Sequence, residues 1–239
     1  MEKQHISPIA LSNTPAGFEV TSTPELTNSA AAAVLNHINS KSNSNFLSLT
    51  EAANYIVEHC FVSFKEKYAR ILPEQLASHL QLEIFEHFDL GTHKGDYITD
   101  EEELGYPNVY WRIVRAKSNN DVGPIHADRW FWDLNGKTVP TTHRRVKVWM
   151  PLIQNDMEPG LSVIPGSHLK NYYYGSQTDV FGKVKPLFVE TEIQELPIPA
   201  QVKVGEAIVF NDNLLHGGRS TNSLRVSIEF TLACVHGPL

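Results

Sequence analysis

Cysteine and long apolar runs are both scarce in this sequence. Its 239 residues include two cysteines, Cys60 and Cys234, which lie far apart and form no Cys-x-x-Cys pair. This excludes a disulfide framework, and the apolar surroundings of both residues favour buried, reduced thiols. No stretch approaches the roughly 18 consecutive apolar residues of a membrane-spanning helix, and residues 1–20 lack the apolar segment of a secretory signal. We therefore expect a cytoplasmic protein with no membrane partner.

Positive charge is also in short supply. The chain has 20 Lys and Arg against 27 Asp and Glu, for a formal net charge of −7. A nucleic-acid-binding protein usually carries a basic excess or a basic stripe. The one compact basic cluster, HRRVK at 143–147, lies inside a strand-like run. The charge balance therefore argues against a nucleic-acid partner and for a small-molecule substrate, and it leaves the oligomeric state open.

The first third of the chain has a helical pattern. Residues 1–22 are mixed and polar, and we expect them to form a loose arm. The triplet Thr23-Pro24-Glu25 is typical of a helix start, and Ser48-Leu49-Thr50-Glu51 is spaced as a capping box in front of a second helix. Apolar residues recur at every fourth position over 76–88, which predicts a third helix. Residues 23–90 thus form the expected helical part.

The pattern changes beyond about residue 105. Segments such as NVYWRIVRAK, HRRVKVWMPLI and LRVSIEFTLAC are short, rich in β-branched and aromatic residues, and separated by Gly, Pro, Asn and Asp. These features predict strands. Helices followed by many short strands indicate an α+β fold, mainly β, in which an antiparallel sandwich or barrel is backed by helices. No linker separates the two parts, so we expect one domain over 1–239 with its β core at 105–239.

The segment GPIHADRWFWDLNG places His126 and Asp128 two positions apart. On a strand, residues i and i+2 point to the same face, so both side chains would reach one point. A metal site and a buried His–Asp hydrogen bond both fit this spacing. A second motif, NDNLLHGGRSTNSLRVSIEF, adds His216 at the edge of a late strand. Two histidines and one carboxylate are the facial triad of non-haem Fe(II) oxygenases, and the lack of a thiolate set argues against structural zinc.

Arg225 and Ser227 stand one residue apart in the strand that follows His216. Their spacing puts both side chains on one face of that strand. A 2-oxo acid that chelates iron through its keto-acid end presents a second carboxylate several ångströms away. An arginine can hold that carboxylate with two parallel hydrogen bonds, and a nearby hydroxyl can add another. An ion pair on the sheet surface is the alternative role for Arg225.

Further motifs connect these residues. The stretches VKVWMPL and PGLSVIPGSH follow the HxD pair, GEAIVFNDNLLHGG leads into His216, and an arginine follows nine residues later. This order, from about residue 107 to the C-terminus, resembles the phytanoyl-CoA dioxygenase family of Fe(II)/2-oxoglutarate oxygenases. The resemblance implies a double-stranded β-helix, or jelly roll, flanked by N-terminal helices. The site residues that it implies are, for Fe(II), His126, Asp128 and His216 and, for 2-oxoglutarate, Arg225, Ser227 and Trp149.

The same resemblance implies an Fe(II)/2-oxoglutarate-dependent dioxygenase that uses O2 to hydroxylate an aliphatic C–H bond and releases succinate and CO2. An aspartate at position 128 fits hydroxylation, because related halogenases have a small residue there. The expected substrate is a small polar metabolite, amino acid or saccharide, since the short chain has little room and few basic runs for coenzyme A. Desaturation or epimerisation by the same cofactors is one alternative. A non-redox, cupin-like jelly roll that binds or isomerises a sugar is another.

Three further residues are candidates for substrate contact. Trp130 lies in the aromatic run after the HxD pair, where core packing is the alternative. Arg144 and Lys147, like Arg145 between them, alternate with apolar residues in a predicted strand. They can face the cavity and pair with an anionic substrate, or they can lie on a solvated strand face.

Overall fold

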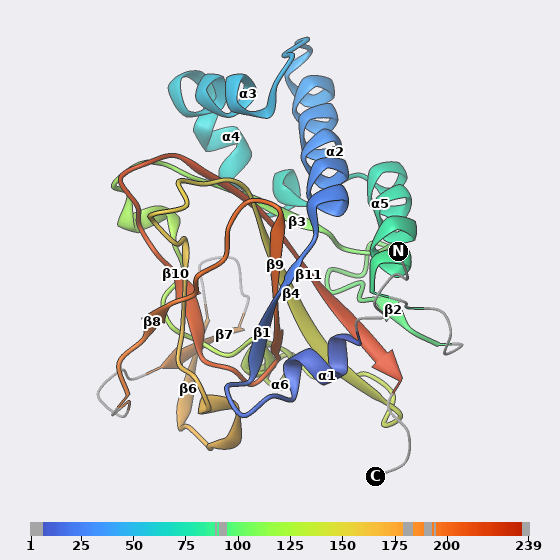
Figure 1. Cartoon of the computed structure of the whole chain (residues 1–239), viewed down its shortest axis with the longest axis vertical. Coiled ribbons are helices and arrows are strands. Elements are labelled where there is room, and N and C mark those ends of the chain that lie inside the picture. Colours follow the sequence, from blue (N-terminus) through green and yellow to red (C-terminus); the bar gives the residue numbers. More distant parts are fainter. Residues whose placement is uncertain are drawn as a thin grey trace.

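The computed structural model describes residues 7–88, 90, 95–178, 184–188, 193 and 195–235 of the chain. Figure 1 shows the helices of residues 24–87 gathered against one side of a β structure. The α-helices are α1 (Pro8–Ser12), α2 (Pro24–Ser42), α3 (Leu49–Tyr55), α4 (Phe61–Lys65), α5 (Glu74–His87) and α6 (Asp128–Leu134). A π-helical turn, η1 (Ile56–Cys60), joins α3 to α4, and short 3-10 turns are η2 (Tyr68–Arg70), η3 (Asn119–Asp121) and η4 (Ser167–Leu169).

A large antiparallel sheet forms the centre of the molecule. Its strands are β1 (Phe18–Ser22), β9 (Glu206–Asn211), β4 (His143–Ile153), β11 (Arg225–Val235) and β2 (Tyr97–Ile98), in that order, and β3 (Tyr110–Val114) also pairs with β11. The pairing of β4 with β11 is the longest and aligns Lys147 with Thr231 and Trp149 with Glu229. Since residues two apart share a face, this register decides which side chains line the interior.

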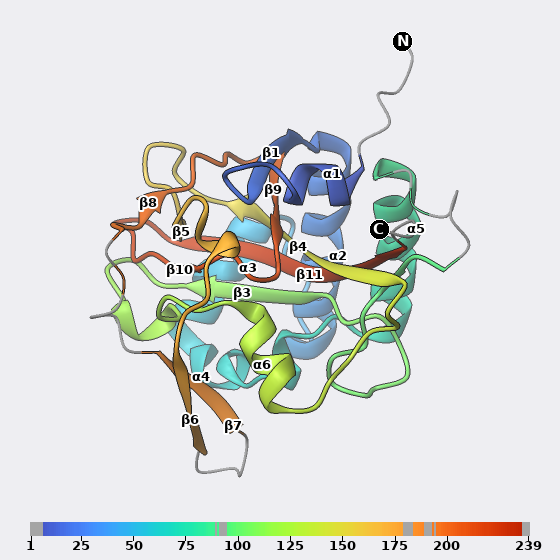
Figure 2. The same cartoon turned by 90° about the horizontal axis from the view of Figure 1, so that it is seen from below.

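A smaller sheet lies opposite the large one. It consists of β10 (His216–Gly218), β5 (Leu161–Val163) and β8 (Ile198–Pro199). Trp149, Ile208 and Phe210 of the large sheet pack with Leu161 and Val163 of the small one in a single buried cluster. A separate hairpin, β6 (Tyr174–Thr178) with β7 (Val184–Phe188), extends beyond α6 (Figure 2). Two facing antiparallel sheets backed by helices confirm the predicted mainly-β jelly roll.

Helices α2 to α5 cover the outer face of the large sheet. Alanine and branched residues of α2 are buried with residues from α5 and with the outward side chains of β4 and β11, such as Val148 and Phe230. The small side chains of the AAAAV run let α2 approach closely, and α2 and α5 pack on each other. The capping box is present, because the Ser48 hydroxyl accepts from the Glu51 backbone N–H at 3.2 Å. In the described part of the chain, no helix combines the length and the apolar character that a bilayer crossing requires.

The expectation of a loose arm over residues 1–22 is wrong for the described part of that segment. Ser7 caps α1, and β1 pairs with β9 along its whole length, from Phe18 opposite Phe210 to Ser22 opposite Glu206. Without β1, the edge of β9 would present unpaired backbone groups to water. Phe18 and Val20 also pack against the cluster between the sheets. The segment is therefore ordered by a partner strand almost 190 residues away, which its polar composition conceals.

Candidate metal centre

The two predicted histidines meet because their backbones pair. His126 and His216 form an isolated β-bridge. Each backbone N–H donates to the carbonyl of the other residue at 2.9 Å. This bridge fastens the chain before α6 to the first residue of β10, and it sets the two imidazole centroids 4.5 Å apart.

Asp128 reaches the histidines from a helix rather than from a strand. The expected strand is interrupted here, because Ala127 is extended (φ −110°, ψ 138°) and Asp128 begins α6. A carboxylate is favoured in the first turn of a helix. Within α6, Arg129 and Asp133 form an i,i+4 ion pair at 3.5 Å. The HxD spacing still brings the two side chains together, but through a strand-to-helix turn.

The three side chains converge on one point. His126, Asp128 and His216 each offer a ligand atom, and these atoms all lie within 4.8 Å of one another. The Asp128 carboxylate is 3.7 Å from Nε2 of His126 through Oδ1 and 3.7 Å from Nε2 of His216 through Oδ2. Separations of this size leave room for an ion with ligand bonds of about 2.0–2.2 Å to imidazole and carboxylate.

Hydrogen bonds orient both imidazoles for metal binding. Nδ1 of His126 is 2.8 Å from the Pro124 carbonyl, and Nδ1 of His216 is 3.0 Å from the Leu214 carbonyl. A carbonyl only accepts, so each Nδ1 carries the proton and each Nε2 presents its lone pair to Asp128. Burial lowers the pKa of His216 to about 4, and the neighbouring His126 contributes to this while Asp128 opposes it. For His216, the neutral form that a metal requires is thus the stable form near pH 7.

The environment of Asp128 tests whether a cation fits. Its Oδ2 is buried and has no hydrogen-bond partner among the described residues. Burial alone would raise the pKa of this carboxyl, but Lys147 first, then His216 and His126, hold it well below the usual range. Nζ of Lys147 lies 3.9 Å from Oδ2. A buried, charged carboxylate with an unbonded oxygen beside two imidazole lone pairs fits a divalent ion.

Lys147 points into the interior from β4. Its side chain is 6% exposed, and its Nζ also lies 3.5 Å from the Thr231 hydroxyl on β11. Asp128, Glu101 and Glu229 together raise the pKa of Lys147 despite its burial. Of the two alternatives for Lys147, the structure places it in the cavity beside the triad and not on a solvated face.

Arg225 occupies a second buried site at the start of β11. It is 2% exposed, its guanidinium donates to the Gly160 carbonyl, and its Nε has no hydrogen-bond partner among the described residues. Burial, reinforced by Arg112, lowers the pKa of Arg225 to about 10. Gly160 leaves room for Arg225, because a Cβ at that position would collide with the arginine side chain and force it to move. A buried guanidinium with spare donors suits an anionic ligand.

Ser227 and Trp149 lie beside Arg225 as predicted. Ser227 is 2% exposed and, two residues along β11, shares the inner face with Arg225. The guanidinium carbon of Arg225 lies 5.7 Å from the Trp149 ring. Trp149 also belongs to the cluster between the sheets, so it packs the core and borders the arginine at the same time.

The remaining candidates for substrate contact are placed differently. Trp130 is 4% exposed and stacks on Tyr174, with ring centroids 4.7 Å apart, so it packs α6 against the hairpin. Arg144 lies on β4 with the parity of Val146 and Val148, which pack toward the helices, and not with the parity of Lys147. Because Arg144 lies near the beginning of β4, it lines an open cleft and not the interior around the triad.

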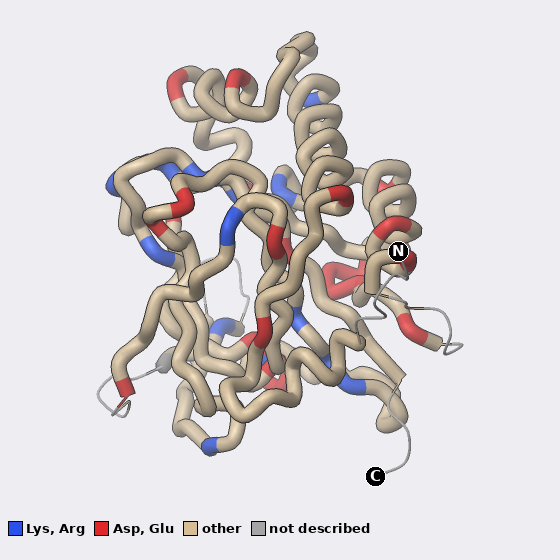
Figure 3. Tube along the Cα trace, viewed as in Figure 1, with Lys and Arg blue, Asp and Glu red and all other residues tan. Residues whose placement is uncertain are grey.

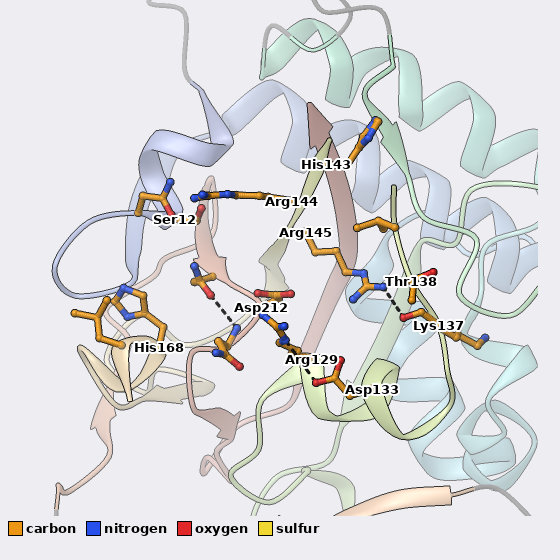
Figure 4. Close-up of a pocket in the computed structure, with 15 residues that line it drawn as sticks. Ser12, Arg129, Asp133, Lys137, Thr138, His143, Arg144, Arg145, His168 and Asp212 are labelled. Carbon is orange, nitrogen blue, oxygen red and sulfur yellow. Dashed lines mark hydrogen bonds and ion pairs between the residues drawn. The ribbon is translucent and has the colours of Figure 1, made fainter. Parts of the chain in front are cut away.

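That cleft has a volume of about 670 Å³ and contains Arg129 and Asp212, which sequence reasoning missed, together with Arg145 of the basic run at 143–147. Arg129, Arg145 and Asp212 all line it (Figure 4). Arg145 shares the strand face of Lys147, as period-2 alternation along the strand requires. Asp212 carried no such signal, since its place depends on the turn between β9 and β10.

A jelly roll that carries two histidines and an aspartate at one end of its interior has the architecture and donor set of the facial-triad metalloenzymes. The family model for phytanoyl-CoA dioxygenase (PhyH) matches residues 96–227. The chain belongs to this family, and its function is of the dioxygenase type. No curated protein sequence matches the chain.

Solved structures agree with this fold. EctD from S. alaskensis with bound Fe has a TM-score of 0.58 at 14% identity and aligns over 97% of this chain and 80% of EctD. The same protein with 2-oxoglutarate and 5-hydroxyectoine gives 0.54 at 16%, over 95% and 77%. The α-ketoglutarate-dependent carbocyclase SnoK gives 0.52 at 10%, over 98% and 84%. EvdMO1 gives 0.53 at 16%, over 95% of this chain and 49% of EvdMO1, so this chain spans about half of that protein. At these identities the likeness concerns the fold.

Proposed function

We propose that this protein is an Fe(II)/2-oxoglutarate-dependent dioxygenase that hydroxylates an aliphatic C–H bond of a small polar substrate. One observation carries the proposal: ligand atoms of His126, Asp128 and His216 lie within 4.8 Å of one another in a dioxygenase-family jelly roll. The charged, unbonded Oδ2 of Asp128 supports a cation at that point. Iron, 2-oxoglutarate and O2 supply the oxidising chemistry when bound.

The residues of this chain have distinct tasks in that proposal. His126 and His216 hold the ion through Nε2, and their Nδ1 hydrogen bonds to backbone carbonyls fix the rings. Asp128 supplies the negative ligand from the first turn of α6. Lys147 balances the second carboxylate oxygen of Asp128. Together they fix the ion at one end of the interior, in a mostly buried setting that limits the access of water.

Arg225 and Ser227 would bind the distal carboxylate of 2-oxoglutarate. The guanidinium is buried and cannot be satisfied by solvent, so an anion that reaches it gains a charge-assisted hydrogen bond at low dielectric. Gly160 leaves space for the guanidinium, and Trp149 borders it. A sugar-binding or isomerising cupin has no need of such an anchor. This buried arginine therefore favours the oxygenase over the non-redox jelly roll.

The proposal is tested by anaerobic titration of the protein with Fe(II) and 2-oxoglutarate. A weak visible absorption band near ~500 nm is expected for the chelate at a facial-triad site. His126→Ala should abolish the band, whereas His79→Ala, a histidine on the exposed face of α5, should leave it unchanged. Failure of the folded wild-type protein to bind Fe(II) and 2-oxoglutarate together would refute the proposal and favour the cupin-like alternative.

Product analysis then separates hydroxylation from the other outcomes of the same chemistry. With a substrate in hand, hydroxylation adds one oxygen atom to the product, and one 2-oxoglutarate yields one succinate and one CO2. Desaturation removes two hydrogen atoms, and epimerisation leaves the mass unchanged. Mass spectrometry of the product distinguishes the three.

A further inference from the structure

An open cleft of about 670 Å³ has Arg129, the residue after Asp128, among the residues that line it. Six segments form its walls: the end of α1, α6, the loop at 137–139, the first residues of β4, η4 and the turn after β9. Figure 4 shows Arg144 extending toward Ser12 and Arg145 toward Lys137 and Thr138, with Asp212 and Arg129 between them. His168, from the PGSH motif, lines it near α1.

The cleft is basic in an acidic protein. Four of its side chains are cationic and two are anionic: Arg129, Lys137, Arg144 and Arg145 against Asp133 and Asp212. The whole chain carries a formal charge of −7. Figure 3 shows that acidic positions are frequent on the helices, on the other side of the large sheet. Arg129 pairs with Asp133 at 3.5 Å and Lys137 with Glu103 at 3.7 Å. Arg144 and Arg145 against Asp212 therefore leave the cleft with a small excess of positive charge, which favours anions.

Three chain segments connect the cleft to the triad. Arg129 directly follows Asp128 in α6, and its backbone N–H donates to the Asp212 carbonyl at 3.0 Å. Asp212 lies on the turn that leads to His216 and β10. Arg145 is two residues from Lys147 on the same face of β4, a distance of about 7 Å along the strand.

The cleft lies on the opposite side of the triad from Arg225. Arg145 is paired with Ala233 of β11. Ala233 is eight residues from Arg225, or about 26 Å along an extended strand. Lys147, whose Nζ is 3.9 Å from Asp128, is paired with Thr231 between these two ends. A ligand at Arg225 therefore leaves the cleft free, and the two arginines serve different molecules.

Two contacts fix the orientation of the Arg145 guanidinium. Its guanidinium stacks over the Trp132 ring at 4.0 Å, and it donates to the Lys137 carbonyl at 2.8 Å. Both contacts fix the plane of the guanidinium, which lowers the entropy cost of binding. Asp212 is half-buried near both Arg129 and Arg145. Burial raises the pKa of its carboxyl to about 6; the two arginines oppose this increase, and Asp128 and Asp133 add to it.

We propose that this cleft admits the substrate and that Arg145, with Arg129 beside it, binds an oxyanion on that substrate, either a carboxylate or a phosphate. The oxidised carbon then lies toward the triad, a few bonds from the anionic group. This inference rests on the proposed oxygenase function and names the substrate class for it: a small anionic metabolite. A neutral saccharide without an acidic group does not fit.

The test uses anions as probes and a paramagnetic ion at the triad as the reporter. The full-length protein is loaded with Mn(II) and saturated with 2-oxoglutarate, so that Arg225 is occupied. Line widths of inorganic phosphate (31P) and of labelled acetate (13C) are then followed as each probe is added, with acetamide as the neutral control. A saturable broadening of phosphate or acetate, absent for acetamide, is expected. The anion that broadens at lower concentration distinguishes a phosphate from a carboxylate substrate.

Variants assign the effect to the cleft. Arg145→Gln should weaken the binding of the probe roughly tenfold to a hundredfold, the range for losing a charge-assisted hydrogen bond. Lys203→Gln removes the same charge from an exposed residue outside the cleft and should leave binding unchanged. Arg129→Gln should also weaken the binding of the probe, and it serves as the test if Arg145→Gln fails to fold. His126→Ala, which lacks a ligand for Mn(II), should remove the broadening.

The contrary outcomes are separable. If the Mn(II)–2-oxoglutarate complex forms but neither anion is broadened, or if the two cleft variants behave like the wild type, the cleft is not an anion site and the oxygenase proposal stands. If Mn(II) and 2-oxoglutarate do not bind together, the oxygenase proposal fails and this inference fails with it.

Discussion

The contact between Lys147 and Asp128 is an interior ion pair, and its disruption should lower the stability of the metal-free protein. Their charged atoms are 3.9 Å apart, and their side chains are 6% and 14% exposed. At an effective dielectric constant of about 20, two unit charges at this distance attract by about 4 kcal/mol. Lys147→Met removes the cation, keeps the length of the side chain, and leaves a buried carboxylate whose Oδ2 has no hydrogen-bond partner among the described residues.

We expect Lys147→Met to lower the free energy of unfolding of the metal-free protein by about 3 kcal/mol, the lower end of the range for breaking a buried ion pair from one side. For a chain of this size that corresponds to a fall in melting temperature of about 6–12 °C. A divalent ion supplies the missing positive charge, so Mn(II) should raise the melting temperature of the variant more than that of the wild type. Thermal unfolding with EDTA and with Mn(II) measures both effects.

The double variant makes this reasoning refutable. The double variant Asp128→Asn/Lys147→Met removes both charges. Its loss of unfolding free energy should therefore be smaller than the summed losses of the two single variants, with a coupling energy of about 2 kcal/mol or more. Lys203→Met, at an exposed position, should have little effect. If the metal-free Lys147→Met protein melts with the wild type, or if the two changes add without coupling, the ion pair does not contribute to stability as argued.

Other expectations follow from the same structure. Arg225→Gln should raise the dissociation constant of 2-oxoglutarate about tenfold to a hundredfold, and Gly160→Ala should weaken binding as well, because the added Cβ collides with Arg225; anaerobic titration measures both. Because burial lowers the pKa of His216 to about 4, the unfolded chain binds this proton at higher pH than the folded chain. Metal-free stability should therefore fall as the pH drops from about 6.5 to 4, by about 3 kcal/mol from this group, as denaturant titrations will show. Deleting residues 1–22 removes β1 and should cause association through the exposed edge of β9, detectable by light scattering.

Matched controls accompany each of these. Gly175→Ala, where an added Cβ meets only an ordinary contact, should not change 2-oxoglutarate binding. His216→Asn should flatten the acid-side loss of stability; an unchanged pH profile would contradict the role given to His216. A chain lacking only residues 1–6 retains β1 and should stay dispersed, and equal behaviour of the two truncations would argue against edge protection.

The triad shows what local sequence can and cannot specify. The spacing of His126 and Asp128 brings two ligands to one point, and His216 completes a set whose donor atoms match a non-haem iron site. The expected strand was wrong, because Asp128 begins a helix. The backbone bridge between His126 and His216, 90 residues apart, is what makes the three side chains meet. The residue types therefore indicated a metal site, whereas the meeting of the three side chains depended on pairing between distant segments.

The sequence by itself determined the helices-then-strands order, the capping box at Ser48 and the alternation along β4, because these depend on neighbours a few residues away. Only the tertiary structure decided that the segment before residue 23 becomes an edge strand, that Lys147 opposes Asp128, and that Arg145 and Asp212 share a cleft. Each of these contacts joins residues from different elements. Charge and burial at such a point arise from the register between strands and the docking of helices, which no short stretch of sequence contains.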